Sequence, residues 1–324
     1  MSHPDHLVDV PTGLRYSLRI EGGPMATTSR ICACILLSLL FGSRAFSQQA
    51  DPEPAIHKAT TFQYTTLQVP GSTSTFATGV NSNGDIVGYY VSAGGVSPFL
   101  YTGGTFQSIP CGTNANGIND DGVIVGFSNV PEITKHGNQF PAFIYQNGDC
   151  SYMVRKAWPE TALNAINNQG IAVGEGWNGP QTDGRGLIDI NGRLTAVPLT
   201  IPGGINNSNA IAGTDCNHTT GVCEGRVVQE LNRRKKSYTR VRYPDSAYTN
   251  LTGINDNDEV IGIWGNQAGQ QQSFVYSLST KTFTVFEVGD SVSSQPTAIN
   301  NSGEIVGWYY DGTNYYGFYG YLSQ

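Results

Sequence analysis

One ten-residue pattern recurs six times along this chain, and it constrains the fold more than any other feature. In each copy a small residue and an aliphatic residue precede an Asn, and a Gly follows seven residues after that Asn. The pairs are Asn81–Gly88, Asn119–Gly126, Asn167–Gly174, Asn206–Gly213, Asn255–Gly262 and Asn300–Gly307. Successive Asn residues are 38, 48, 39, 49 and 45 residues apart. A constant core with variable spacers indicates a structural unit that tolerates loop insertions.

The constant core predicts a hairpin turn in every copy. Three residues after the Asn comes a residue type that tolerates a left-handed backbone. These residues are Gly84, Gly122, Gly170, Asn209, Asp258 and Gly303. A type I turn followed by one left-handed residue closes three-residue hairpins, and an Asn at the first position can bond to the backbone two residues on. The recurrence of Asn and Gly therefore has a structural explanation.

The rest of each copy predicts three more strands. In the first copy, an apolar strand over 85–90 follows the turn, then a polar loop, a strand near 99–101 and a tight turn into 105–109. Four antiparallel strands in about 44 residues describe one propeller blade. The expected fold is therefore an all-β, six-bladed β-propeller with four antiparallel strands per blade. Blade repeats are expected to start near residues 76, 114, 163, 203, 250 and 295.

The strand count predicts how the ring closes. The sixth copy ends with its third strand, 316–322, so its fourth strand is missing. A lone strand over 61–69 precedes the first copy and resembles the fourth strand 105–109. We expect it to complete the last blade and to cover the open edge. A linear β-solenoid, the main alternative, would explain neither strand.

The N-terminal region predicts export. An apolar run over 31–42 follows Arg30 and precedes small residues, which is typical of a Sec-type signal peptide. Cleavage is expected after Ala45 or Ser47, and the run is too short to span a bilayer. A lipoprotein signal through Cys34 and a buried apolar segment are the alternatives. The protein is expected to be extracellular or periplasmic, with no transmembrane span.

These signals also divide the chain. Signal peptides begin at the N-terminus, so residues 1–24 are interpreted as mis-called upstream residues and 25–47 as the signal peptide. Residues 48–60 are interpreted as a linker, and 61–324 as a single propeller domain.

The cysteines fit an exported chain. Cys111, Cys150, Cys216 and Cys223 follow the signal peptide, and an even count in an oxidising compartment permits disulfides. Cys216 and Cys223 bracket one short loop, so we predict that they are joined, whereas the pairing of the other two stays open. Zinc binding in this loop is the alternative, but two Cys and His218 supply only three ligands.

Composition and motifs restrict the function classes. The formal charge is −7 and only 13% of residues are charged, which argues against nucleic-acid binding. The basic run 233–236 is interpreted as a solvated hairpin tip. No serine-hydrolase, zinc-protease, C-x-x-C or phosphate-loop motif occurs, and Asp256, Asp258 and Glu259 lack calcium-loop spacing. No cofactor or metal is therefore expected.

The six copies resemble the HAF-type extracellular repeat of predicted exported bacterial proteins. The shared signature is the G-I-N-x-x-G-x-I-V-G core, and the resemblance covers roughly residues 61–324. The His-Ala-Phe stretch that names the family reads Ser97-Pro98-Phe99 in copy one and Pro141-Ala142-Phe143 in copy two. The His is absent from every copy, and copies three and four also lack the Phe. The resemblance implies export and repetition but no reaction.

Propeller topology indicates where a ligand would bind. The connections between second and third strands and between blades share one face and are long, and loops on a rigid scaffold are where sites occur. Aromatic residues gather where the second strands reach this face, with Tyr315 and Tyr316 across the last loop. They pack between blades or form a rim that stacks on a ligand. The candidate ligand-binding residues are Tyr89, Tyr90, Phe127, Trp177, Trp264, Trp308, Tyr309 and Tyr310.

Two acids supply the alternative hypothesis. After their Gly, copies three and four carry Glu175 and Asp215 where copies one and six carry aromatics. Neighbouring blades would bring these carboxylates together, and paired carboxylates cleave glycosides. The leading hypothesis is a secreted, non-enzymatic binding or adhesion propeller with a carbohydrate or protein ligand. The alternatives are an extracellular carbohydrate-active hydrolase or lyase that uses Glu175 and Asp215, and a purely structural envelope protein.

Overall fold

A computed structural model describes residues 53–58, 61–134, 137–153, 155–178, 184–217, 220, 222–229 and 237–323. Residues 1–24, which we interpreted as mis-called upstream residues, lie outside the described residues. So do the expected signal peptide with its cleavage sites and the basic run 233–236. His218 of the suggested zinc loop also lies outside the described residues.

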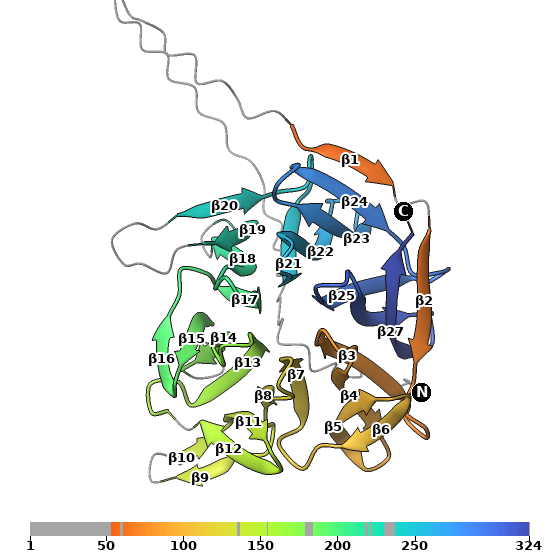
Figure 1. Ribbon diagram of the computed structural model, residues 1–324. Coiled ribbons are helices and arrows are strands. Elements are labelled where there is room, and N and C mark those ends of the chain that lie inside the picture. The colour runs from red at the N-terminus through yellow and green to blue at the C-terminus, as the bar shows by residue number, and fades with distance from the viewer. Residues whose placement is uncertain are drawn as a thin grey trace, which may run out of the picture. The chain divides into compact units, whose positions relative to one another are not determined.

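The described residues form six β-sheets arranged as blades around a central axis, which confirms the six-bladed propeller (Figure 1). In blades one to six the innermost strands are β3 (Ser74–Val80), β7 (Asn114–Ile118), β13 (Glu160–Ile166), β17 (Ile201–Ile205), β21 (Tyr248–Ile254) and β25 (Ser293–Ile299). The second strands are β4 (Ile86–Ser92), β8 (Ile124–Phe127), β14 (Ala172–Trp177), β18 (Ile211–Asn217), β22 (Glu259–Gly265) and β26 (Ile305–Tyr310). The third strands are β5 (Gly95–Thr102), β11 (Ala142–Gln146), β15 (Arg185–Ile190), β19 (Val222–Val228), β23 (Gln271–Ser277) and β27 (Tyr315–Leu322).

The outer strands complete the blades. In blades one to five they are β6 (Thr105–Ser108), β12 (Asp149–Met153), β16 (Arg193–Ala196), β20 (Tyr238–Val241) and β24 (Thr282–Phe286). A small hairpin of β9 (Glu132–Thr134) and β10 (Gly137–Gln139) lies in the connection between β8 and β11.

The N-terminal strand closes the ring as expected. Strand β2 (Phe62–Leu67) pairs antiparallel with β27, so that Phe62 faces Leu322 and Leu67 faces Gly317. This pairing covers the edge that blade six would otherwise expose.

The segment expected to be a linker contains a further strand. Strand β1 (Ala55–Lys58) pairs in parallel with β24 and extends blade five to five strands. All four of its residues are exposed, and its register comes from backbone pairing alone. Because neither side of β1 is buried, its sequence lacks the alternation of apolar and polar residues that predicts a strand.

The repeated glycines have two distinct functions in the backbone. The turn residues expected to be left-handed all have positive φ, from 60° at Asp258 to 82° at Gly303. The glycine seven residues after each Asn instead lies opposite a β-bulge of the innermost strand. A Cβ at Gly88 would collide with the carbonyl of Phe76, and one at Gly262 with that of Asn250. Glycine is therefore required at this position by close backbone contact.

The hydrophobic core is divided among the seams between blades. Phe99, Phe143, Phe274 and Phe318, one on each of four third strands, are completely or almost completely buried. Each seam mixes two blades: Phe318 of blade six, for example, packs with Ile261 of blade five. This division leaves the channel at the axis lined mainly by the innermost strands and their turns.

Candidate functional site

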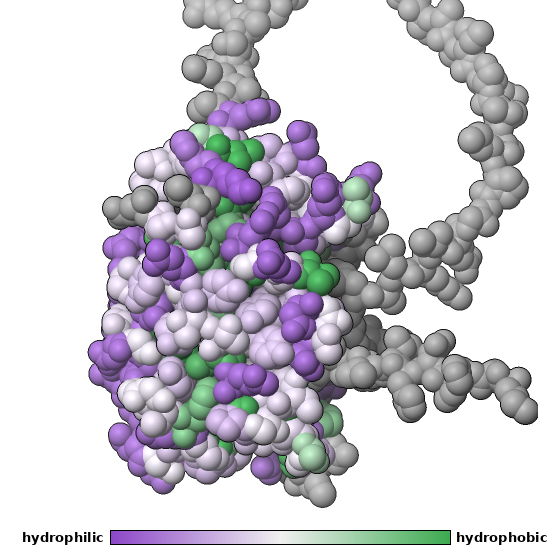
Figure 2. Space-filling model, turned by 90° about the vertical axis from the view of Figure 1, so that its right-hand side faces the viewer, coloured by the Kyte–Doolittle hydropathy of each residue, from purple (hydrophilic) through white to green (hydrophobic). Residues whose placement is uncertain are grey.

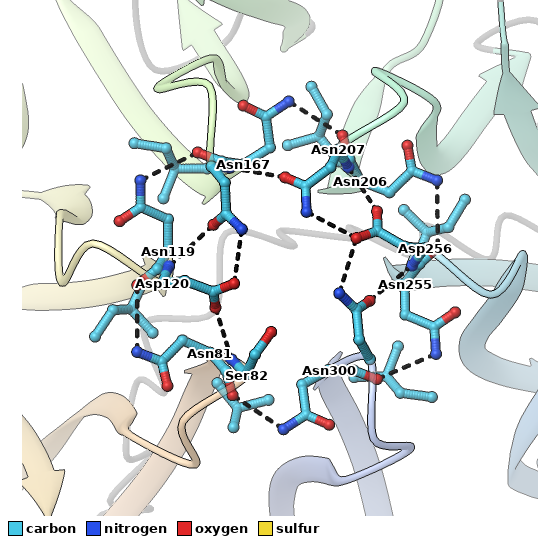
Figure 3. Close-up of a pocket in the computed structure, with 18 residues that line it drawn as sticks. Asn81, Ser82, Asn119, Asp120, Asn167, Asn206, Asn207, Asn255, Asp256 and Asn300 are labelled. Carbon is cyan, nitrogen blue, oxygen red and sulfur yellow. Dashed lines mark hydrogen bonds between the residues drawn. The ribbon is translucent and has the colours of Figure 1, made fainter.

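The central channel contains a closed ring of asparagine amides. At the end of the channel that carries the hairpin turns, a cavity of about 70 Å³ is lined by residues that include the six repeated Asn residues. The Nδ2 atom of each Asn donates a hydrogen bond to the backbone carbonyl of the corresponding Asn in the next blade, over 2.9 to 3.2 Å (Figure 3). Asn300 donates to Asn81 and so completes the circle.

The same side chains also close their own turns. The Oδ1 atom of Asn167, for example, accepts backbone N–H bonds from Gln169 and Ile171, both at 3.0 Å. Sequence reasoning predicted the bond to the residue two positions on, but not the link to the next blade. These buried amides use both donor and acceptor atoms for folding, so we assign them a structural role.

A second polar layer uses the residue after each Asn. The backbone N–H of Asn207 donates to Oδ1 of Asp256 at 2.7 Å, and Oδ2 of Asp256 accepts from the side chains of Asn207 and Asn301. Asp120, in blade two, accepts bonds from the Ser82 N–H and the Asn168 amide (Figure 3). Burial alone would raise the pKa of Asp120, but these bonds lower it overall. Both carboxylates thus belong to the inter-blade network.

A third layer joins the blades through the bulge residues. Thr78 donates to the carbonyl of Ala115 at 2.7 Å, Asn164 to that of Pro202 at 2.9 Å. At Gly203 the bulge has no side chain, and a Cβ there would lie 2.7 Å from the carbonyl of Leu251. The channel wall is thus built largely from contacts between blades.

Glu175 lies beside Asn164 of this wall and is a buried carboxyl. It directly follows Gly174 on β14, and only 8% of its surface is exposed. Its Oε1 atom accepts a hydrogen bond from the Asn164 amide at 3.1 Å. Burial raises the pKa of Glu175 to about 7, and the bond from Asn164 opposes this only in part. A carboxyl in this environment exchanges its proton near neutral pH.

Asp215 is not the equivalent of Glu175. Asp215 stands two residues after Gly213, so the residue that occupies the register position of Glu175 in blade four is Thr214. The carboxylate of Asp215 forms an ion pair with Arg226 and accepts a hydrogen bond from Thr200 at 3.2 Å. Strand alternation still turns Glu175 and Asp215 towards the same seam, because Val173 of β14 and Ile211 of β18 share one core cluster. Each acid is nevertheless held by different partners.

Aromatic rings of blades one and six gather around Phe76 of the innermost strand β3. Tyr89 is 6% exposed and stacks on Phe76 at 4.8 Å, and burial raises its pKa. Trp308 meets Phe76 edge-on at 5.8 Å, and Tyr315 at 5.6 Å. Tyr310 stacks on Tyr315 at 4.8 Å. The outermost rings of this cluster are half-buried, whereas Tyr89 belongs to the core.

Other candidate rings lie apart from this cluster. Trp264 faces the preceding blade and stacks on Tyr243 at 4.1 Å with the planes parallel within 1°. Trp264 and Trp308 therefore pack on opposite sides of their blades, as side-chain alternation predicts. Trp177 is half-buried at the end of β14 beside Gly184, and Phe127 is half-buried at the end of β8. Tyr90 packs on the core of the seam between blades six and one.

Tyr309 lies on the other face of the blade-six hairpin, where it stacks on Tyr316 at 5.4 Å and contacts Tyr64 edge-on at 6.0 Å. The sequence analysis missed Tyr64, because a contact between β2 and blade six depends on the closure of the ring. The position of Tyr64 on the expected closing strand was the available signal.

Both pairs of described cysteines are bonded. Cys216 and Cys223 are directly opposite each other on β18 and β19. Cys111 and Cys150 join the connection between blades one and two to the outer strand β12.

None of the described residues forms a helix with the length and apolar character of a membrane span.

No protein-family model matches the chain, and no curated protein matches it. Among solved structures, the chain is similar to the β-propeller domain of the Trilobed protease from Pyrococcus furiosus, with 9% identity, a TM-score of 0.35, and coverage of 59% of this chain and 60% of that one. It is also similar to YCF48 from Cyanidioschyzon merolae, with 10% identity, a TM-score of 0.44 and coverage of 80% and 98%. A puromycin-hydrolysing peptidase from Mycobacterium tuberculosis matches with 12% identity, a TM-score of 0.41 and coverage of 79% and 52%. The chain thus spans 60% of the length of the first of these, and the similarities concern architecture and carry no activity.

Proposed function

We propose that this chain is an exported, non-enzymatic binding or adhesion propeller built from HAF-type repeats, with its ligand on the face of the long connections. The observation that carries the proposal is the half-exposed aromatic cluster on the blade-six hairpin, which includes Trp308, Tyr310 and Tyr315. Aromatic rings that remain partly exposed beside polar loops are typical of binding surfaces. The two disulfides support an oxidising compartment.

The test is retention of the purified protein on immobilised polysaccharides and on extracellular matrix proteins. We expect saturable retention that is lost when Trp308 or Tyr315 is replaced by Ala in a folded variant. Retention that survives substitution of every half-exposed ring of the hairpin would contradict the proposal. Export is tested separately, by N-terminal sequencing of the protein recovered outside the cytoplasm, which should begin at residue 46 or 48.

A hydrolase that uses Glu175 is the second candidate. The observation in its favour is the Glu175 carboxyl, whose pKa of about 7 suits a general acid. Against it, Asp215 is neutralised by Arg226 and is not the register partner of Glu175. Release of reducing ends from a polysaccharide, abolished in Glu175→Gln, would favour this candidate over binding alone.

A further inference from the structure

The seam between blades five and six carries three tyrosines in succession near its outer edge. Tyr64 on β2 lies 6.0 Å from Tyr309 on β26, and Tyr309 lies 5.4 Å from Tyr316 on β27, measured between ring centroids. We name these three residues the tyrosine row. Tyr64 is 37% exposed, and the other two are half-buried. Tyr309 packs against the core of this seam, whereas Tyr64 at the outer strand leaves aromatic surface exposed.

The rings of the row are held in place by their neighbours. Tyr64 stacks on the buried Phe62 with the two planes parallel within 6°. Its hydroxyl lies against the backbone of Gly289, where any Cβ would collide with it. The Tyr309 hydroxyl shares a hydrogen bond with Thr66 at 3.0 Å. A surface that is rigid before binding loses little entropy when a ligand is bound.

Polar groups border the row. Burial raises the pKa of Tyr64, and the Tyr309 hydroxyl and the negative charge of Asp290 raise it further, which places Asp290 close to the row. Carboxylates and amides are acceptors and donors for sugar hydroxyls, whereas aromatic faces pack on the apolar C–H faces of sugar rings.

The surroundings indicate the class of ligand. Figure 2 views the side of the ring that carries β1 and β2, and its surface is mostly hydrophilic or neutral with small, separate hydrophobic spots. A protein partner that buries a large apolar patch is disfavoured by this pattern. The carboxylate of Asp290 would repel an anionic polymer.

We propose that the tyrosine row is a subsite for an uncharged polysaccharide chain, whose sugar rings stack on Tyr64 and Tyr316 while its hydroxyls bond to Asp290. This inference rests on the proposed binding function and names its ligand class. It also places the contact on the blade-five side of the hairpin, away from the Trp308 cluster.

Calorimetric titration of the full mature chain with soluble xylan, laminarin and cello-oligosaccharides, and with polygalacturonate as the anionic probe, tests this inference. Tyr64→Ala and Tyr316→Ala should each weaken binding of an uncharged glycan about three- to tenfold. Tyr321→Ala is the matched control, since Tyr321 is also on β27, is similarly exposed at 44%, and faces the other way. Tyr64→Phe keeps the ring, so it should retain most of the affinity.

Three results would overturn the inference. Uncharged glycans that bind equally well to both row variants, but poorly to Trp308→Ala, would leave the binding function intact and place the site elsewhere. Tighter binding of polygalacturonate than of every uncharged glycan would refute the ligand class. No binding of any glycan, with retention on matrix protein that depends on Trp308, would remove the inference and keep the broader function. If Tyr64→Ala does not fold, Tyr316→Ala and Tyr64→Phe still decide between these outcomes.

Discussion

Replacing Glu175 by Gln should stabilise the protein at neutral and alkaline pH and have little effect in acid. The folded-state pKa of Glu175 is raised by burial from 4.5 to about 7. Between these two values the folded protein holds more protons than the unfolded chain, so stability falls as pH rises. Below the lower value both states are protonated, and the penalty disappears. The sign is opposite to that of an ordinary surface carboxylate in an ion pair.

The magnitude follows from the difference between the two pKa values. About 2.5 pH units, at about 1.4 kcal/mol per unit, correspond to a loss of about 3.5 kcal/mol once Glu175 is fully ionised. Gln has the same shape, and its side-chain oxygen still accepts the bond from Asn164. The variant should therefore keep the inter-blade contact and lose only the titration.

Urea denaturation of wild type and Glu175→Gln between about pH 4 and about pH 8 measures this difference. The free energy of unfolding of the variant minus that of wild type should grow from near zero to about 3 kcal/mol across this range. Asp149→Asn, an exposed position on β12, is the control for a surface substitution. A difference that stays constant with pH would refute the assignment of Glu175 as a buried, largely neutral carboxyl.

Three further predictions concern the ring and its closure. Asn300→Ala should lower the free energy of unfolding by about 3 kcal/mol, because it removes the bond to the carbonyl of Asn81 and leaves two turn N–H groups without partners. Asn83→Ala at the exposed turn should have little effect, and equal values for the two variants in thermal denaturation would contradict the ring's role. Deletion of residues 61–69 should expose the edge of β27 and cause aggregation in size-exclusion chromatography, and a monomeric truncation of equal stability would argue against closure. Serine replacement of Cys111 and Cys150, which are 39 residues apart, should lower the free energy of unfolding by about 4 kcal/mol. Serine replacement of Cys216 and Cys223, which are seven residues apart, should lower it by only about 2.5 kcal/mol, because a shorter loop costs less entropy to close. The reverse order in denaturant titrations would refute this reasoning.

The blades and their closure could be predicted from the sequence because their signals are local or can be counted. The left-handed residue at Asp258, for example, follows from its place three residues after an Asn. The closing strand was predictable because the sixth repeat lacks a fourth strand and one unassigned strand precedes the first repeat. Strand β1 was not predictable, because parallel pairing of four exposed residues leaves no hydrophobic pattern.

The candidate site was less predictable because its chemistry depends on seams between blades. A sequence position states which residue follows the Gly, but not which partner it meets across a seam. Glu175 and Asp215 already differ in the sequence, since Glu175 directly follows its Gly and Asp215 stands two residues after its own. Their partners, Asn164 for Glu175 and Arg226 for Asp215, come only from the structure. Of the predicted aromatic rim, Tyr89 belongs to the core. Tyr64 entered the site only through the closure of the ring.

The repeat itself separates structural positions from positions free to carry function. All six Asn residues of the repeat bond to the next blade, so a change at any one of them would remove one inter-blade hydrogen bond. The position directly after the Gly that follows each repeated Asn by seven residues is not part of this ring of bonds. In blades one to six it holds Tyr89, Phe127, Glu175, Thr214, Ile263 and Trp308. A scaffold that fixes its seams through backbone carbonyls and asparagine amides can accept different side chains at this position in each blade. Function is therefore expected where the blades differ. Glu175 is one such difference, confined to the seam between blades three and four, whereas the tyrosine row uses other positions, on β2, β26 and β27.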